Sequence, residues 1–279
     1  MRTIGIIAIA VLFVPAFAFA NGQKEGAMEY EDGVYFAAEE EFSEQTGWRY
    51  CVTLEVENGE IVMAEWNGAN VAGYEDKVTR SESGKYGMVE RGGAIASWAE
   101  QAALTEEHLL ETQDPTSVSY TSDEGLTDAI SGVTIHVKEF FTLAERALGQ
   151  GPAGYGMWRD GHFYAEEDGF DERTGWKNTV DLTVISGYIM AAQWNAVHEE
   201  GGEDKDTRSR NGTYGMVENG GAMDPWYIQA DRAEEHLLET QDPTDISYTD
   251  EAGSTDAISG VSIHVREFFQ LAEEALQRR

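Results

Sequence analysis

Residues 127–137 read TDAISGVTIHV, and almost the same stretch, TDAISGVSIHV, returns at residues 255–265. Apolar residues at spacings of three and four follow each copy, and this pattern predicts an amphipathic helix. Ser131 is a suitable N-cap and Gly132 permits a tight turn, so we expect the helix to begin here. The stretch therefore predicts the start of a closing helix in each half of the chain.

A hydroxyl group occupies the same place in both copies. Thr134 and Ser262 are expected in the first turn of their helices, and Ser259 and Gly260 are the second copy's N-cap and turn residues. Free backbone N–H groups and the positive end of the helix dipole attract anions at such a point. The sequence thus predicts a phosphate seat beside each hydroxyl.

The whole chain is a duplication. A shift of 128 residues aligns residues 30–148 with residues 158–276 without a gap, and well over half of the positions are identical. A repeat of this length indicates two complete domains, because solenoid repeats are far shorter. We place module 1 at residues 30–149 and module 2 at residues 158–279. Residues 150–157, rich in glycine with one proline, are expected to form a short flexible linker.

Each module is predicted to be α+β, with an antiparallel sheet that contains a hairpin and is packed by two helices. Asn58-Gly59 is a strong hairpin signal. A glycine-rich loop and then a helix follow the hairpin. In module 2 we expect Asp224 as the N-cap of that helix and Pro225 as its first residue. For module 1 the pattern predicts strands over residues 33–39, 50–57, 61–66 and 117–121.

The first 20 residues have the character of a secretory signal peptide. Arg2 precedes an apolar run over residues 4–17, and Ala18-Phe19-Ala20 is a small-x-small cleavage site. Residues 21–29 would then be a linker. No cysteine follows the run for lipid attachment. We expect a periplasmic or extracellular protein that is soluble after cleavage; an uncleaved segment would associate it with the membrane.

Composition excludes several classes of function. The net charge is −33, from 52 acidic and 19 basic residues, and this argues against binding nucleic acid or anionic lipid. The single cysteine, Cys51, permits no intramolecular disulfide and is expected as a small strand residue. Glu106-Glu107 and Glu234-Glu235 recur one module apart and are predicted on solvated helix faces. No recurring spacing indicates catalytic or metal-binding residues.

Both modules resemble the FMN-binding domain family along nearly their whole length. The shared features are the opening Asp-Gly, the Asn-Gly hairpin, the Tyr-Gly-Met-Val-Glu segment and the Asp-x-x-Ser-Gly-x-Thr/Ser run. The family includes flavin subunits of sodium-pumping and Rnf-type oxidoreductases. The likeness is closer to tandem-module flavin lipoproteins of extracellular electron transfer. In the family a flavin transferase esterifies the last hydroxyl of the run with the phosphate of FMN.

The resemblance implies that Thr134 and Ser262 are the acceptors, with Asp128 and Asp256 at the leading acidic position. The chain departs from the family where valine replaces the usual alanine before each acceptor and where the second acceptor is a serine. It also lacks the lipid-attached cysteine of the lipoproteins.

One covalent FMN per module, and so up to two per chain, needs side chains that position the flavin ring. Aromatic side chains suit the ring faces, and glycine lets backbone N–H groups approach a flat ligand. The alternative interpretation makes the tryptophans core residues and the Tyr-Gly-Met loops structural turns. The candidates for ring contacts are Trp66, Trp194, Tyr86, Gly87, Met88, Tyr214, Gly215 and Met216.

We therefore expect an exported electron carrier without a substrate-reducing domain of its own. A flavin transferase would mature it, and a membrane quinone or flavin oxidoreductase would donate its electrons. The dense negative charge predicts a low reduction potential, because it disfavours the anionic reduced flavin. The alternatives are a non-redox, secreted, acidic tandem binding module or antigen, and a noncovalent FMN carrier that serves a separate reductase.

Overall fold

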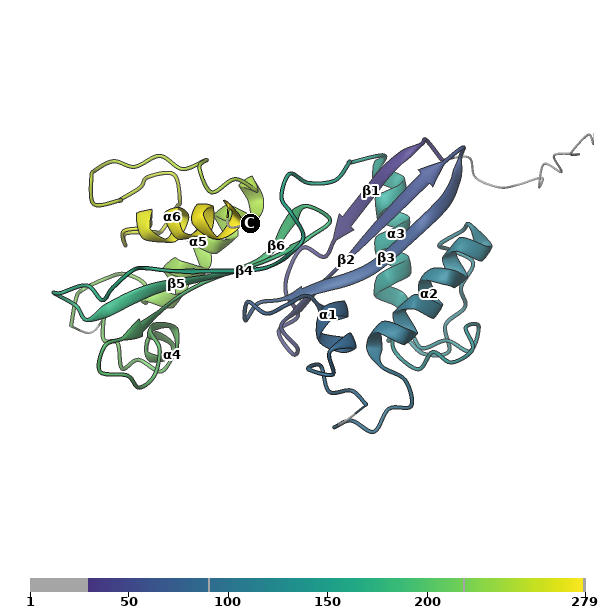
Figure 1. The fold of residues 1–279 in the computed structure, drawn as a ribbon, viewed down its shortest axis with the longest axis horizontal. Helices are drawn as coiled ribbons and strands as arrows, with labels where there is room; N and C mark the ends of the chain where they lie inside the picture. The colour runs from purple at the N-terminus through teal and green to yellow at the C-terminus, as the bar shows by residue number, and fades with distance from the viewer. Residues whose placement is uncertain (1–29, 90, 218, 278–279) are drawn as a thin grey trace, which may run out of the picture.

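The structure, a computed structural model, describes residues 30–89, 91–217 and 219–277. The predicted signal peptide and first linker lie outside these residues. Two three-stranded antiparallel sheets, ordered β1-β2-β3 and β4-β5-β6, form the two modules together with their helices (Figure 1). The predicted α+β class with two tandem small domains is confirmed. Within the described ranges we find no helix suited to spanning a membrane.

The two modules have the same order of elements. Module 1 contains β1 (Gly33–Ala38), β2 (Trp48–Glu57), β3 (Glu60–Asn70), α1 (Lys77–Glu82), α2 (Trp98–Thr112) and α3 (Lys138–Gln150). Module 2 contains β4 (Gly161–Glu166), β5 (Trp176–Ile185), β6 (Tyr188–His198), α4 (Lys205–Arg210), α5 (Trp226–Thr240) and α6 (Arg266–Gln277). Two differences from the prediction stand out. Residues 117–121 form a loop instead of a strand, and the short helices α1 and α4 were not anticipated.

The hairpin turns behave as their sequence predicts. Asn58 and Gly59 have φ angles of 54° and 78°, and Ser186 and Gly187 have φ angles of 53° and 80°. Two successive positive φ angles define the turn that matches the twist of a two-stranded ribbon. The strand that leads into each turn buries every second residue on its helix side. In module 1 these residues are Val52, Leu54 and Val56, as predicted.

The closing helices cover the inner face of each sheet. In α3 the buried side chains include Phe140, Phe141 and Ala144, which belong to the same core cluster as Leu54 and Val56. The matching residues of α6 are buried in module 2. Helix α5 buries Trp226, Ala230, Ala233 and Leu237, as predicted, but it begins one residue late, because Pro225 is its N-cap.

The predicted starts of the closing helices are wrong. Helix α3 begins at Lys138 and its N-cap is Val137, so Ser131 caps no helix, and Thr134 lies four residues before the first turn. The Val137 N–H donates to Gly125 O at 2.9 Å instead of to the carbonyl four residues earlier. In module 2 the Val265 N–H donates to Gly253 O at 3.0 Å, and α6 begins at Arg266. Long-range hydrogen bonds thus replace the expected first helical turn.

The two modules pack directly against each other. A small apolar cluster between them contains Cys51 from β2 and Met190 from β6. Phe36 stacks on Tyr188 with ring centroids 4.2 Å apart. The linker contributes as well, because Ala153 N–H donates to the Val34 carbonyl at 2.8 Å. The linker was predicted to be flexible, but it pairs with the edge of β1.

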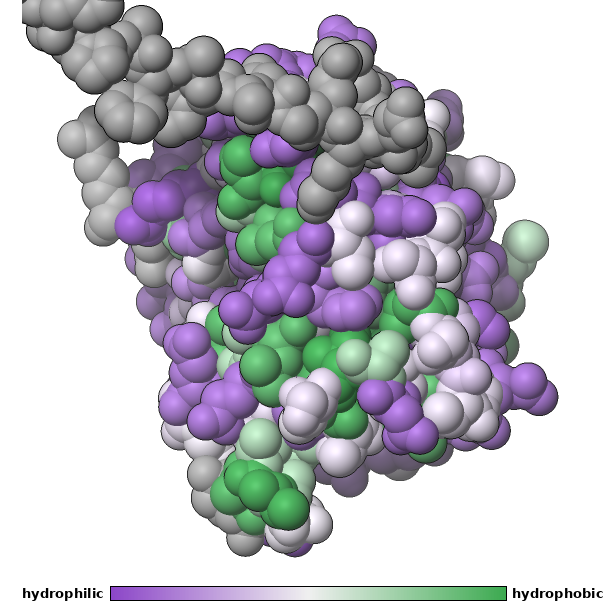
Figure 2. Space-filling view, turned by 90° about the vertical axis from the view of Figure 1, so that its right-hand side faces the viewer, coloured by the Kyte–Doolittle hydropathy of each residue, from purple (hydrophilic) through white to green (hydrophobic). Residues whose placement is uncertain are grey.

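The face of the molecule shown in Figure 2 is mainly hydrophilic. On the face shown in Figure 2, apolar side chains form small patches separated by hydrophilic ones. This distribution agrees with acidic residues that are spread along the whole chain, and it gives the molecule the solvated surface expected from its net charge.

Candidate functional site

The repeated motif of module 2 forms a loop that is held by one side chain of α5. Gln229, which is 1% exposed, accepts hydrogen bonds through Oε1 from Ser262 N at 2.7 Å and from Ser262 Oγ at 3.1 Å. The same oxygen accepts from Ile263 N at 3.2 Å, and Gln229 Nε2 donates to Asp224 O at 2.8 Å. The Ser262 side chain remains exposed. A neighbouring helix, rather than the helix that follows, therefore positions this hydroxyl.

Module 1 repeats the arrangement. Gln101 Oε1 accepts from Thr134 N at 2.7 Å and from Thr134 Oγ1 at 3.1 Å, and Gln101 is fixed in turn by the carbonyl of Ala96. The backbone N–H groups of both acceptor residues are thus engaged, so the expected seat of free N–H groups at these two residues is wrong. We did not predict either glutamine, although a glutamine 33 residues before the acceptor in both copies was a usable signal.

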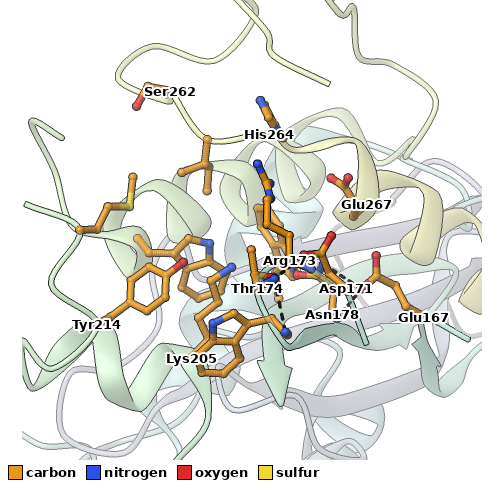
Figure 3. Close-up of a pocket in the computed structure, with 15 residues that line it drawn as sticks. Glu167, Asp171, Arg173, Thr174, Asn178, Lys205, Tyr214, Ser262, His264 and Glu267 are labelled. Atoms are coloured by element: carbon orange, nitrogen blue, oxygen red, sulfur yellow. Dashed lines mark hydrogen bonds between the residues drawn. The ribbon is translucent and has the colours of Figure 1, made fainter. Parts of the chain in front are cut away.

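A cavity of about 410 Å³ lies beneath the loop of module 2. Figure 3 shows Ser262 and His264 on the loop above it, and Lys205 and Tyr214 below. The volume falls in the range of about 300–1,000 Å³ that is usual for small-molecule sites. The apolar and aromatic part of its wall is formed by Trp176, Trp194, Tyr214, Met216, Trp226 and Ile263.

A lysine points into this aromatic wall. Lys205 Nζ lies 4.8 Å from the ring centroid of Trp226, 5.4 Å from that of Tyr214 and 5.9 Å from that of Trp176. Such distances permit cation–π attraction. Within the described part of the chain, Nζ has no hydrogen-bond or ion-pair partner. Burial lowers the pKa of Lys205 to about 8.

Lys77 holds the matching place in module 1 and is more deeply buried, with 1% of its surface exposed. Its Nζ lies 4.4 Å from the ring of Trp48 and 4.6 Å from those of Tyr50 and Tyr86. Lys77 Nζ also donates a hydrogen bond to Tyr50 Oη at 2.8 Å. Burial lowers the pKa of Lys77 to about 7. Sequence reasoning missed both lysines, although basic residues are scarce in this chain and this one recurs.

The other end of the module 2 cavity is acidic. Glu167, Asp171 and Glu267 lie together at this end, with Arg173 between them and Lys205 (Figure 3). Glu167 Oε2 accepts from Asn178 N at 2.7 Å and from Asn178 Nδ2 at 3.0 Å. The cavity is therefore polarised, with aromatic rings and an ammonium group at one end and carboxylates at the other.

The structure brings some predicted ring contacts of module 2 together with the acceptor. Trp194, Tyr214 and Met216 line the same cavity as Ser262. Gly215 turns the chain with φ of 67°, and a Cβ atom there would lie 2.4 Å from Asn219 Nδ2. The remaining predicted residues of this module, Gly215, Asp256, Ser259 and Gly260, are outside the described lining of the cavity.

In module 1 the predicted ring contacts lie in or against the core. Trp66 is 1% exposed, and Tyr86 and Met88 are partly buried against the same cluster. Gly87 makes a turn with φ of 73°, where a Cβ atom would collide with the Arg91 guanidinium. The motif residues Asp128, Ser131 and Gly132 are exposed on the loop that carries Thr134. The acceptor loop and the aromatic cluster are thus both present in module 1.

Two glutamates that were predicted on solvated helix faces have a different role. Glu234 of α5 accepts a hydrogen bond from the backbone N–H of Trp194 at 2.7 Å, and Glu106 of α2 accepts one from the backbone N–H of Trp66 at 2.7 Å. Burial raises the pKa of Glu234 to about 8 and that of Glu106 to about 7. Each glutamate fastens its helix to the middle of a strand, β3 or β6, so the prediction of a solvated face is wrong for Glu106 and Glu234. Their neighbours Glu107 and Glu235 are exposed, as predicted.

A second cavity, of about 640 Å³, lies between the modules. Its lining includes Glu40 and Arg49 from module 1 and Asp206, Arg210 and Asp231 from module 2. Arg210 donates to both Asp206 and Asp231, so its charge is already paired. None of the predicted site residues lines this second cavity.

No protein-family model matches this chain, and no curated protein matches it. Solved structures that match include a solution NMR structure of a Clostridium thermocellum protein. It is 55% identical, covers 43% of this chain and 90% of its own, and has a TM-score of 0.35. A crystal structure of a Clostridium perfringens protein is 23% identical, covers 44% of this chain and 88% of its own, and also has a TM-score of 0.35. Each match spans about one module. At 55% identity across nearly all of that protein, this chain belongs to the same family as the Clostridium thermocellum protein.

Proposed function

We propose that this protein is an exported electron carrier with FMN attached through phosphoester bonds to Thr134 and Ser262. The observation that carries the proposal is the exposed Ser262 hydroxyl on the edge of an aromatic cavity of about 410 Å³. A transferase needs an accessible alcohol oxygen, and the attached ring needs an apolar space within reach of it. Both requirements are met at the loop that carries Ser262, with the cavity directly beneath it.

The residues around the cavity suit a flavin. When bound, FMN supplies the redox chemistry, and the protein supplies position and electrostatics. Gln229 holds Ser262 at the edge of the cavity, and the partly exposed Tyr214, Met216 and Ile263 provide apolar surface for a planar ring. Trp176, Trp194 and Trp226 are buried in the wall of the cavity, with 8%, 3% and 2% of their surface exposed. The indole of Trp194 is fixed within this wall, since its Nε1 donates to Asn178 Oδ1 at 3.1 Å.

Two modules in contact suit transfer of electrons from one flavin to the other. The stacked Phe36 and Tyr188 and the paired linker hold the modules against each other. This arrangement keeps the second group at a high effective concentration. A membrane quinone or flavin oxidoreductase would be the electron donor.

The proposal is tested by weighing the denatured chain after expression with a flavin transferase. Two FMN ester adducts are expected, and Thr134→Val and Ser262→Ala should each remove one. Thr142→Val, which removes an exposed hydroxyl on α3, is the control and should keep both. A yellow colour that is lost on unfolding would indicate the noncovalent carrier. A colourless chain of unmodified mass, made with an active transferase, would indicate a secreted binding module and overturn the proposal.

A further inference from the structure

The two modules differ at one position that faces the recurring lysine. Tyr50 on β2 and Asn178 on β5 occupy equivalent places, 128 residues apart. The Tyr50 ring lies nearly parallel to that of Trp98, with centroids 6.1 Å apart and an interplanar angle of 21°, and its hydroxyl receives the hydrogen bond from Lys77. In module 1 a tyrosine therefore fills the space beside the lysine.

In module 2 the shorter side chain leaves that space open. Asn178 is turned away from Lys205, because its Nδ2 donates to Glu167 and its Oδ1 accepts from Trp194. Lys205 consequently lines the cavity and is partly exposed, whereas Lys77 is almost fully covered. The two modules also differ in charge near this lysine. Arg173, which lines the cavity of module 2, stands at the position that Gln45 occupies in module 1.

We propose that the modules hold their flavin rings differently: the ring of module 2 enters the aromatic cavity and faces Lys205, whereas Tyr50 fills that place in module 1 and keeps its ring outside. The identity of the ligand rests on the proposed function; the difference in access to the two lysines does not. Lys205 and the rings around it are suited to a planar, electron-rich anion, because the ammonium group supplies the opposite charge and the rings supply apolar surface.

The difference has a consequence for electron transfer. A bound flavin would gain one negative charge on taking up two electrons and one proton, and the Lys205 ammonium at the aromatic end of the cavity would stabilise that charge. With its pKa lowered only to about 8, Lys205 is mostly protonated at neutral pH. Module 2 therefore has the higher reduction potential, and electrons pass from module 1 to module 2.

Access is tested first, on the chain without flavin. Brief acetylation with acetic anhydride followed by peptide mapping should modify Lys205 and spare Lys77. Tyr50→Asn should expose Lys77, and Asn178→Tyr should protect Lys205. Tyr50→Phe keeps the ring and removes the hydroxyl, so it should leave Lys77 protected if the ring is the barrier. Equal modification of the two lysines in the native chain would overturn the proposal.

Occupancy is tested on chains matured with the transferase and carrying one flavin each, Thr134→Val or Ser262→Ala. In titration with dithionite the module 2 flavin should show the higher potential. Lys205→Met should lower it, while the matched Lys77→Met should leave the module 1 flavin unchanged. Equal potentials, or equal shifts for both lysine variants, would overturn the placement of the ring. An unmodified mass with unequal acetylation would instead reject the proposed function and keep the open cavity at Lys205.

Discussion

Gln229 Oε1 lies 2.7 Å from the backbone nitrogen of Ser262 and 3.1 Å from its hydroxyl oxygen, so one amide oxygen of α5 fixes the residue that is proposed to carry the flavin. The glutamine replaces the helix terminus that the sequence suggested as the organiser of this site. Its effect on the loop is therefore open to direct test.

Gln229→Leu should loosen the loop of module 2. The variant leaves the N–H groups of Ser262 and Ile263 without their acceptor, and because Ser262 is exposed to water we expect the net loss of a typical hydrogen bond, about 0.5–1.5 kcal/mol. We expect a matching loss in the free energy of unfolding by urea, faster hydrogen exchange of both amides and less flavin on Ser262. Gln101→Leu should have these effects on Thr134 instead. Unchanged exchange at Ser262 in Gln229→Leu would contradict the role of the glutamine.

Glu234 should make stability fall as pH rises. Its pKa is about 8 in the folded protein against an ordinary 4.5, so between these values the unfolded state binds fewer protons than the folded state. The free energy of unfolding contributed by this group therefore decreases across that window. In Glu234→Gln the side chain still accepts a hydrogen bond from the backbone N–H of Trp194 but does not titrate. The free energy of unfolding of this variant, relative to the wild type, should therefore increase as the pH rises from 4.5 to 8. Calorimetry at several pH values measures this, with the exposed Glu235→Gln as the control. A constant difference between Glu234→Gln and the wild type would refute it.

Lys77 should have the opposite pH dependence in a higher window. Its pKa is lowered from 10.5 to about 7, so between these values the unfolded state binds more protons than the folded state. The contribution of this group to the free energy of unfolding therefore rises with pH across that window. Lys77→Met removes the titration, and the wild type should gain stability relative to this variant as pH increases. The exposed Lys138→Met is the control, and equal pH profiles for both variants would argue against a buried, titrating Lys77.

Tyr188→Ala should uncouple the two modules. The change removes the ring stacked on Phe36 and the hydrogen bond from Tyr188 Oη to Gly154 O, which is 3.0 Å long. A stacked aromatic pair contributes about 0.5–1.5 kcal/mol beyond the burial of its area. We expect the calorimetric trace to separate into two transitions, one for each module. Tyr120→Ala, away from this contact, should not separate them, and a single unchanged transition in Tyr188→Ala would show that the contact does not couple the modules.

The sequence predicts the elements of this fold whose signals are local. The Asn58-Gly59 turn and the buried face formed by Val52, Leu54 and Val56 follow from short-range stereochemistry, and both are found. Helix α4 was missed because its six residues are too few to show a helical period, although Asp204 caps it by accepting from the Thr207 N–H. The start of α6 was misplaced because the Val265 N–H bonds to Gly253 instead of continuing a helix toward the motif.

In the candidate site, too, sequence reasoning found some residues and missed others. Ser262 and Tyr214 were proposed from the motif and the resemblance, and they line one cavity. Gln229 and Lys205 were missed because their roles come from contacts with residues far along the chain, such as the 33-residue separation between Gln229 and Ser262. No hydrophobic period or capping pattern marks a residue whose partner is set by tertiary packing.

The contact between the modules joins unlike surfaces. Module 1 contributes Cys51 and Ala69, and module 2 contributes Ile185 and Met190. A heterologous contact of this kind can propagate from one copy to the next and build open filaments. In module 1, however, the position that matches Ile185 is Glu57, which is exposed and charged. The duplicated surface of module 1 thus presents a carboxylate where module 2 presents Ile185, and this charge disfavours growth by the same contact beyond the pair encoded in a single polypeptide.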